Sequence, residues 1–511
     1  MVFSSILFLF LYLPVVLGIY HLLMLPVTLG RRSRVWIKLC NLFLLVANVI
    51  FYAWGEPVLI WVMVLSCSID YVAALVISGA WRKGPVVTLV PGAPRTTAQK
   101  LGLVLSLSSN LAFLCYFKYF NFGLSNYNSI VAHLGYRGLQ LHDVARVALP
   151  LGISFYTFHS MSYTIDVYRG YATATRNYID FASYVTLFSQ LVAGPIVRYR
   201  HIAAMLVDRV VTIEGFASGV SRFIIGLGKK VLIANTVAQA ADRIFALPGE
   251  HLTAGLSWLA VVCYTLQIYF DFSGYSDMAI GLGRMLGYDF LENFNYPYIS
   301  RTITEFWRRW HISLSTWFRD YLYIPLGGNR KGPLRTYANL VTVFFLCGLW
   351  HGASWTFVVW GLYHGAFLVI ERMGLGDLLE KRARIMGHVY SLLAAMGGWV
   401  LFRSESFTQA VDFFKAMAGF GAGAGTAYSV ARYLTADVAI AIAAGAVFSV
   451  PVVPTLVRVR EWILTRESAA LRVWVGSAVP AVQVAALCMV LLESSMSLAS
   501  GTHNPFIYFR F

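Results

Sequence analysis

Apolar runs long enough to cross a bilayer recur along this chain, and they constrain its fold more than any other feature. A helix of about 20 apolar residues spans the ~30 Å hydrocarbon core of a membrane. Such runs cover Val2–Leu25, Val35–Trp54, Val58–Trp81 and Leu101–Phe122, and others follow towards the end of the chain. Backbone groups in lipid must bond to one another, which favours helices over open sheets. The sequence therefore predicts an all-α polytopic membrane protein with about 11 transmembrane helices.

The composition agrees with a chain that lies mostly in lipid. Of its 511 residues, 58% are hydrophobic and 13% charged, whereas a soluble domain carries about 25% charged residues. No repeat or soluble segment interrupts the pattern, so residues 1–511 are interpreted as one transmembrane domain. Proline and glycine inside Leu149–Gly170 predict a broken helix, and re-entrant or interfacial helices are expected beside the full spans. Close helix packing is predicted at Gly274, Gly281, Gly283 and Gly287.

The net charge of +16 is assigned to cytoplasmic loops, where Lys and Arg collect in membrane proteins. Arg31, Arg32 and Arg34 follow the first apolar run and predict a periplasmic N-terminus. Membrane lipids are the expected partners of this charge, and nucleic acid is not, because no RNA- or DNA-binding motif accompanies it. The six cysteines lie scattered through apolar runs without a CxxC pair, which predicts neither disulfides nor a metal site.

One region, residues 301–365, departs from ordinary membrane sequence. A basic, tryptophan-rich segment carries His311, and a turn with Gly327 and Gly328 follows. An apolar run then ends in Trp350, His351 and Gly352. Ionisable groups within a membrane are costly, and their presence usually marks a functional site. Residues 301–365 are therefore the candidate catalytic region.

The first part of this region, Arg301–Leu322, separates into an aromatic face and a basic stripe when it is drawn as one helix. The aromatic face contains Trp307, Trp310 and Trp317. The basic stripe contains Arg301, Arg308 and Arg319, with Ser315 beside it, and His311 lies at the boundary between the two. One interpretation is a helix on the membrane surface whose arginines pair with lipid phosphates. The other is a stripe that holds the phosphates of a coenzyme A donor. The pattern alone fits both.

His351 ends the apolar run Leu340–Trp350, where an imidazole must find a polar partner or destabilise the fold. It could be a structural histidine bonded to a carbonyl. It could also be a general base, because a neutral imidazole near pH 7 can remove the proton of an attacking hydroxyl. His364 lies about 140° away around a continuous helix, so a metal pair is not expected and His364 is interpreted as a packing residue. The sequence lacks the GxSxG, HExxH, Walker and HxxxD signatures of other enzyme classes.

Several long blocks resemble the membrane-bound O-acyltransferase family. They are LPLGISFYTFHSMSYTIDVYRG, QLVAGPIVRYRH, GLGKKVLIAN, QIYFDFSGYSDMAIGLGRMLGY, FWRRWHISLSTWFRDYLYIPLGGNR and LWHGASWTFVVWGLYHG. The resemblance implies helices around a central tunnel, with the donor arriving from the cytoplasm and the acceptor from the other side. It also implies that the family's two histidines correspond to His351 and His311.

From this resemblance we expect a bacterial inner-membrane O-acetyltransferase that acts on an exopolysaccharide, alginate in the first instance. Acetyl-CoA would be the donor substrate, with no permanently bound cofactor, and a periplasmic SGNH-type acetyltransferase would complete the transfer. The residues expected to bind the donor are Arg308, Arg309, Arg319, Trp307, Trp310 and Ser315. Cellulose, peptidoglycan and teichoic acid are alternative acceptors. The alternative from another class is a carrier of the acyl donor, for which Asp70, Asp166 and Asp271 would provide an ionisable path.

Overall fold

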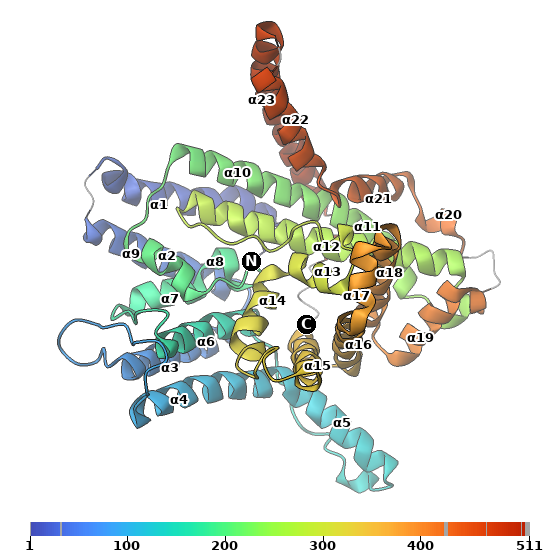
Figure 1. The fold of residues 1–511 in the computed structure, drawn as a ribbon, viewed down its shortest axis with the longest axis horizontal. Coiled ribbons are helices and arrows are strands. Elements are labelled where there is room, and N and C mark those ends of the chain that lie inside the picture. The colour runs from blue at the N-terminus through green and yellow to red at the C-terminus, as the bar shows by residue number, and fades with distance from the viewer. Residues whose placement is uncertain (1, 31–32, 424–427, 467, 502, 506–511) are drawn as a thin grey trace.

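The computed structural model describes the whole chain except residues 1, 31–32, 424–427, 467, 502 and 506–511. Every regular element within the described ranges is a helix, which confirms the predicted all-α class (Figure 1). Arg31 and Arg32, on which the predicted orientation of the N-terminus partly rests, lie outside the described residues.

The first half of the chain contains the predicted N-terminal spans and then a group of shorter helices. Its α-helices are α1 (Leu13–Thr28), α2 (Arg34–Ala53), α3 (Ile60–Ser78), α4 (Thr97–Leu114), α5 (Phe120–His133), α6 (Ile153–Arg169), α7 (Tyr178–Thr186), α8 (Phe188–Leu191), α9 (Tyr199–Val207), α10 (Ile213–Gly228) and α11 (Asn235–Phe245). Short π-helical or 3₁₀ turns lie between some of them: η1 (Phe8–Tyr12), η2 (Cys115–Tyr119), η3 (Arg137–Leu139) and η4 (Lys229–Ala234).

The second half begins with the longest helix and contains the candidate catalytic region. Its α-helices are α12 (Ala254–Met285), α13 (Ile303–Arg309), α14 (Ile312–Phe318), α15 (Pro333–His351), α16 (Trp355–Ile370), α17 (Gly376–Lys381), α18 (Arg384–Arg403), α19 (Phe407–Lys415), α20 (Val430–Tyr433), α21 (Ala436–Phe448), α22 (Val452–Arg466) and α23 (Ala469–Ala499). Its short turns are η5 (Gly249–His251), η6 (Pro297–Ile299), η7 (Arg319–Tyr323), η8 (Glu371–Leu375) and η9 (Ala416–Phe420).

The helices make this a multi-pass membrane protein. Seven helices within the described residues are long and apolar enough to cross a bilayer, or eight if the bent pair α21 and α22 forms one span. The predicted count of about 11 is therefore not confirmed. One reason is that residues 153–207 fold into four helices of 17, 9, 4 and 9 residues, most of them shorter than a full span. The predicted break in Leu149–Gly170 falls at Gly152, before α6 begins.

Glycines bring two helix pairs into direct backbone contact. A Cβ on Gly226 of α10 would lie 2.6 Å from the carbonyl oxygen of Gly274 on α12, and a Cβ on Gly281 equally close to that of Gly219. These contacts confirm the predicted packing at Gly274 and Gly281, because only glycine allows such an approach. A Cβ on Gly348 of α15 would likewise collide with the carbonyl of Phe357 on α16. The α15–α16 hairpin is therefore tightly packed.

The single helix predicted over Arg301–Leu322 is wrong. Helix α13 ends at Arg309, Trp310 is extended, and His311 adopts the left-handed conformation with φ +43° before α14 begins. The break is held by Asn293, whose side-chain oxygen accepts the backbone N–H of Ser313 at 3.1 Å. Asn293 thereby satisfies a backbone donor that a continuous helix would have bonded internally. The faces drawn from a constant rotation per residue do not apply across this break.

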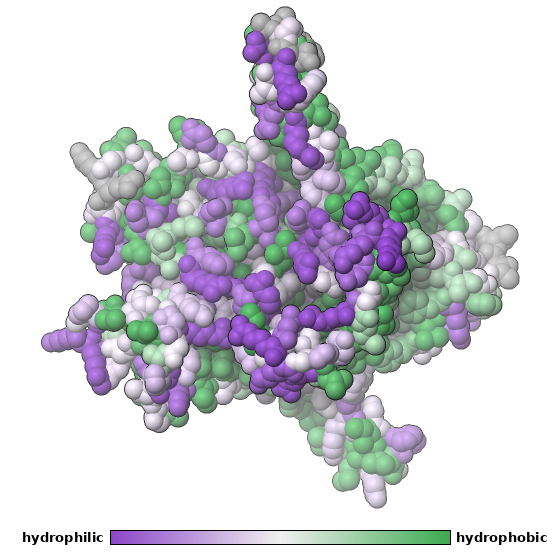
Figure 2. Space-filling view, in the orientation of Figure 1, coloured by the Kyte–Doolittle hydropathy of each residue, from purple (hydrophilic) through white to green (hydrophobic). Residues whose placement is uncertain are grey.

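The candidate catalytic region lies in the middle of the molecule. In Figure 1, α13 and α14 lie near the centre of the viewed face, with α15, α16 and α17 beside them. Figure 2 shows hydrophilic residues gathered over this central part, while much of the periphery is hydrophobic. The region is therefore surrounded by apolar helices and open to a polar face.

Candidate active site

His351 is buried at the last position of α15. Its ring is enclosed by aromatic rings, with centroid distances of 4.9 Å to Trp350, 4.9 Å to Trp360 and 5.3 Å to Phe402. Neither ring nitrogen has a hydrogen-bond partner among the described residues. A buried polar group without a partner costs stability unless a ligand or water satisfies it. Both nitrogens of the His351 ring are therefore available to a group that enters the site.

A small chamber borders His351. It has a volume of about 30 Å³ and is lined by His351, Trp350, Lys118, the turn Leu149–Gly152, and the start of α6, including Ser154. Gly152 has φ +72°, and a Cβ there would approach the carbonyl of Leu191 to 2.7 Å, so this turn needs glycine. The chamber has room for a small group rather than a sugar ring.

His311 is fully buried, and its Nδ1 lies 3.1 Å from the Asn293 side-chain oxygen. The same oxygen accepts hydrogen bonds from the backbone N–H and the hydroxyl of Ser313. Because this atom accepts the Ser313 N–H, it is an acceptor, and His311 donates to it through Nδ1–H. Nε2 of His311 is then an acceptor, and it has no partner among the described residues.

Trp350 lies next to both histidines. Its ring centroid is 6.2 Å from that of His311 and 4.9 Å from that of His351. The left-handed backbone of His311 is unusual for a residue with a side chain, and such strain clusters at functional sites. The structure thus brings together the two histidines that the sequence singles out. His364 packs between Trp307 and Trp360 in the same aromatic cluster, with centroid distances of 5.3 and 5.1 Å.

A larger pocket, the arginine pocket, borders Trp307 of this aromatic cluster and has a volume of about 390 Å³. The residues that line it are Thr304, Trp307, Arg308, Ile312, Leu314, Ser315, Thr316, Phe318, Arg319, Tyr323, Asn329, Leu340, Val343, Phe344, Cys347, Leu368 and Arg372. Arg308, Arg319 and Arg372 are exposed, whereas Cys347 is buried. The pocket thus combines three cationic groups with an apolar interior.

The positions on α15 relate the two cavities to each other. Residues 340, 343, 344 and 347 line the arginine pocket, and residues 350 and 351 line the small chamber. Because a helix has about 3.6 residues per turn, Cys347 of the pocket lies just over one turn before His351. His351 therefore lines the small chamber and lies about one helical turn beyond the nearest α15 residue of the arginine pocket.

Four of the six residues expected to bind the donor line the arginine pocket: Trp307, Arg308, Ser315 and Arg319. Arg309 instead pairs with Glu305 at 2.9 Å, one helical turn away. Trp310 is buried against Trp399, with ring centroids 4.8 Å apart. Arg309 follows Arg308 by about 100° around α13, and Trp310 lies at the break that ends this helix, so neither lines the pocket.

Sequence reasoning missed three residues of the site. Asn293, which holds His311, lies in the loop before α13, and no spacing motif links the two residues. Lys118 lies in an apolar run more than 200 positions before His351. A lone lysine in such a run is itself an indication of a functional site. Arg372 follows α16 and reaches the arginine pocket only through the fold.

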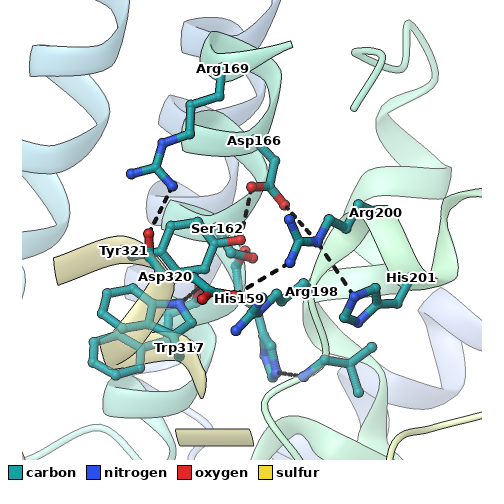
Figure 3. A network of polar contacts seen from close by, with 12 residues as sticks. His159, Ser162, Asp166, Arg169, Arg198, Arg200, His201, Trp317, Asp320 and Tyr321 are labelled. Atoms are coloured by element: carbon teal, nitrogen blue, oxygen red, sulfur yellow. Dashed lines mark hydrogen bonds and ion pairs between the residues drawn. The ribbon is translucent and has the colours of Figure 1, made fainter. Parts of the chain in front are cut away.

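A network of charged residues supports one wall of the arginine pocket. Figure 3 shows its members, which come from α6, the start of α9 and η7: Asp166, Arg169, Arg198, Arg200, Asp320 and Tyr321. The Asp320 carboxylate accepts hydrogen bonds from Arg198 at 2.6 Å and from Arg319 at 2.7 Å. The network thus connects η7, which carries Arg319, to the buried part of the bundle.

Opposing influences act on the ionisation of Asp320. Partial burial would raise the pKa of this carboxyl, but the hydrogen bonds and charges of Arg319 and Arg198 outweigh it and lower the pKa. Asp320 is therefore ionised at neutral pH, and its ion pairs are at full strength.

Replacing Asp320 by alanine is expected to lower the thermal stability of the protein in detergent. Arg198 has only 5% of its side chain exposed, so the substitution removes the closest carboxylate from a buried guanidinium. Removing one partner of a buried ion pair costs about 3–5 kcal/mol. Thermal unfolding followed by intrinsic fluorescence measures the change.

The matched control for this variant is Asp377→Ala. Asp377 pairs with Lys381 at 3.3 Å, and both side chains are at least 70% exposed. Exposed pairs contribute about 0–1 kcal/mol, so this variant should unfold close to the wild-type temperature. Equal effects of the two substitutions would contradict the structural role given to the network.

The chain is similar in sequence to a described protein family and to several named proteins. The family model described as "MBOAT, membrane-bound O-acyltransferase family" matches residues 94–375, which include both histidines and the arginine pocket. A protein of Azotobacter vinelandii named probable alginate O-acetylase is 42% identical over 100% of both chains. A protein of the same name from Pseudomonas putida is 47% identical over 82% of this chain and 81% of its own.

A more distant relative has a different named acceptor. The peptidoglycan O-acetyltransferase of Helicobacter pylori is 33% identical over 82% of this chain and 80% of its own length. These matches extend across the buried histidines, the arginine pocket and the packed helices that support them. The chain therefore belongs to the membrane-bound O-acyltransferase family and is an acyltransferase.

Proposed function

We propose that this acyltransferase takes acetyl from acetyl-CoA on the cytoplasmic side of the bacterial inner membrane and passes it outward for the O-acetylation of alginate. The names of the relatives support the acceptor, because two of them, similar over most of the chain, are probable alginate O-acetylases. The observation that carries the chemistry is His351, whose two ring nitrogens have no partner among the described residues. It lines a chamber suited to a small hydroxyl-bearing group, and a pocket suited to the donor lies about one turn away along α15.

His351 acts in this proposal as the general base. One ring nitrogen removes the proton of the acceptor hydroxyl while the hydroxyl oxygen attacks the thioester carbonyl carbon. A carbon–oxygen bond forms, the carbon–sulfur bond breaks, and the coenzyme A sulfur leaves with the proton that His351 gives up. The aromatic rings around His351 exclude water, which would otherwise compete with the acceptor.

The arginine pocket is the proposed donor site. Arg308, Arg319 and Arg372 are suited to the phosphates of coenzyme A, because guanidinium groups bind phosphate through charge-assisted hydrogen bonds. The apolar interior towards Cys347 is suited to the pantetheine arm, whose thioester would then approach His351. His311 presents Nε2 as an acceptor and would orient the donor by accepting a hydrogen bond from a pantetheine amide.

The direction of transfer is part of the proposal. Basic residues gather near the mouth of the arginine pocket, and basic loops face the cytoplasm in membrane proteins. The N-terminus would then be periplasmic, and the small chamber would open towards the periplasm. Because that chamber holds about 30 Å³, the first acceptor would be a slender hydroxyl-bearing group. A periplasmic SGNH-type acetyltransferase would carry the acetyl group on to the polysaccharide.

The carrier alternative finds no supporting observation. Its three carboxylates all lie in fixed contacts: Asp70 with Ser106 at 2.6 Å, Asp166 with Tyr321 at 2.9 Å, and Asp271 with Lys230 at 2.6 Å. A transport path needs ionisable groups that face an open route. These three instead join neighbouring helices.

Purified protein in lipid vesicles tests the donor and the chemistry together. Acetyl-CoA labelled in both the acetyl group and the nucleotide is added outside, with a hydroxyl acceptor inside. We expect free coenzyme A thiol outside and acetylated acceptor inside, with no nucleotide label in the lumen. Intact donor in the lumen without thiol release would favour a carrier. In cells, loss of acetyl groups from peptidoglycan instead of alginate upon gene deletion would overturn the proposed acceptor.

A further inference from the structure

A buried lysine contacts the end of the helix that carries His351. The Lys118 ammonium donates hydrogen bonds to the carbonyl oxygens of Trp350 at 2.5 Å and His351 at 3.3 Å, and to the Ser154 hydroxyl at 3.1 Å. It also lies 5.8 Å from the centroid of the Trp350 ring. Lys118 lines the same small chamber as His351. One side chain therefore contacts both the backbone of the proposed base and its chamber.

The partners of Lys118 make its position unusual. The side chain is buried, and its hydrogen-bond partners are neutral oxygens rather than carboxylates. Burying a cation without a counter-ion is costly. Part of the cost is offset because the last carbonyls of a helix are unsatisfied and carry partial negative charge. A shorter polar side chain could bond these oxygens at lower cost, so the presence of lysine itself calls for an explanation.

A local irregularity puts Lys118 and its neighbour in place together. They lie in η2, a π-helical turn between α4 and α5, and such turns are frequent at functional sites. The Tyr119 hydroxyl donates to the carbonyl of Leu349 at 2.5 Å. Two successive residues of η2 thus donate hydrogen bonds to the backbone carbonyls of the last three residues of α15.

This contact matters because the His351 ring has no polar anchor of its own within the described residues. Both ring nitrogens are unpartnered, and the ring is held by aromatic contacts. The backbone at Trp350 and His351 therefore sets where the imidazole points. Lys118 and Tyr119 fix that backbone from outside the helix.

We propose that Lys118 is a positioning residue for His351. Its ammonium holds the last turn of α15 against the small chamber, with Tyr119 as a second clamp, so that the imidazole lies ready for the acceptor hydroxyl. This inference rests on the proposed function, in which His351 is the general base. Displacements of about 1 Å can reduce turnover roughly 10²-fold, so a clamp on this backbone has a measurable effect.

The test measures turnover and donor binding separately in Lys118→Met, Lys118→Arg and Tyr119→Phe. Lys118→Met is expected to reduce kcat roughly 10- to 100-fold, while the Kd for acetyl-CoA is unchanged because the arginine pocket is not altered. Lys118→Arg retains the charge and the donors and should recover part of kcat. Tyr119→Phe removes one neutral hydrogen bond and should reduce kcat about 2- to 10-fold.

A purely structural lysine would give a different pattern. In that case Lys118→Met would lower the unfolding temperature, but the folded fraction would show wild-type kcat, which would overturn the proposal. A parallel rise in donor Kd would also overturn it. If Lys118→Met does not fold, the Tyr119→Phe variant tests the proposal instead. Wild-type turnover in Tyr119→Phe would then contradict the proposed positioning of His351 by η2. His351→Ala is measured alongside. If that variant remains active, the proposed base fails, whereas an inactive His351→Ala with a normal Lys118→Met rejects only the clamp.

Discussion

His351→Ala is expected to reduce acetyl transfer about 10²- to 10⁴-fold, which is the usual contribution of a general base. The substitution removes the imidazole that lines the small chamber, about one turn of α15 from the arginine pocket. Because the donor pocket is formed by other residues, the Kd for acetyl-CoA should change little while kcat falls. The measurement is release of coenzyme A thiol by the reconstituted protein, together with the acetyl content of the polysaccharide in cells.

The matched control is His364→Gln. His364 is equally buried in the same aromatic cluster, and its ring nitrogens are also unpartnered among the described residues. It lines neither cavity. We expect this variant to retain turnover. That result would show that the loss of turnover in His351→Ala is not due to burial and aromatic packing alone. Wild-type turnover in a folded His351→Ala protein would refute the assignment of the base.

Removing the arginines of the pocket is expected to raise KM for acetyl-CoA with little change in kcat. A hydrogen bond to a charged group contributes about 1.5–3 kcal/mol, so Arg308→Gln and Arg372→Gln should each raise KM about 10- to 100-fold. Both side chains are exposed at the pocket. The effect should shrink at high salt, because exposed charges are screened. Steady-state kinetics at two ionic strengths measure both effects.

Arg335→Gln serves as the control for net charge. Arg335 is an exposed arginine in the first turn of α15, and it does not line the pocket. Its substitution removes the same charge near the same region and should leave KM unchanged. If Arg308→Gln and Arg372→Gln change only the amount of protein in the membrane, the arginines bind lipid phosphates instead. That was the other interpretation of the basic stripe.

Some of the site could be predicted because it depends on residues close in sequence. The run Leu340–Trp350 predicted an apolar helix ending at His351, and α15 ends there. Arg308 and Arg319 were predicted to share a basic stripe, and they do share a pocket. The reason for their proximity differs from the prediction, because the chain breaks at His311 and folds around the pocket.

Other features could not be predicted because they depend on contacts between distant segments. The helix break depends on Asn293, which bonds Ser313 from a separate loop. The packing of Trp310 against Trp399, outside the pocket, occurs at that break. The number of spans could not be fixed from the sequence for a related reason. Apolar residues at 153–207 are buried against other helices in short pieces, and hydropathy cannot distinguish burial in protein from burial in lipid.

The sequence by itself determined that this chain is a helical membrane protein, because lipid imposes long apolar runs that are visible without a structure. Its motif blocks also indicated the family and the two histidines. Only the tertiary structure decided what surrounds those histidines: an amide that holds His311, a lysine at the end of α15, a small chamber at His351 and an arginine pocket along the same helix. The physical reason is that hydrophobic periodicity reports one helix at a time. A site between helices depends on close packing and hydrogen bonds across more than 200 positions of sequence, which no local pattern records.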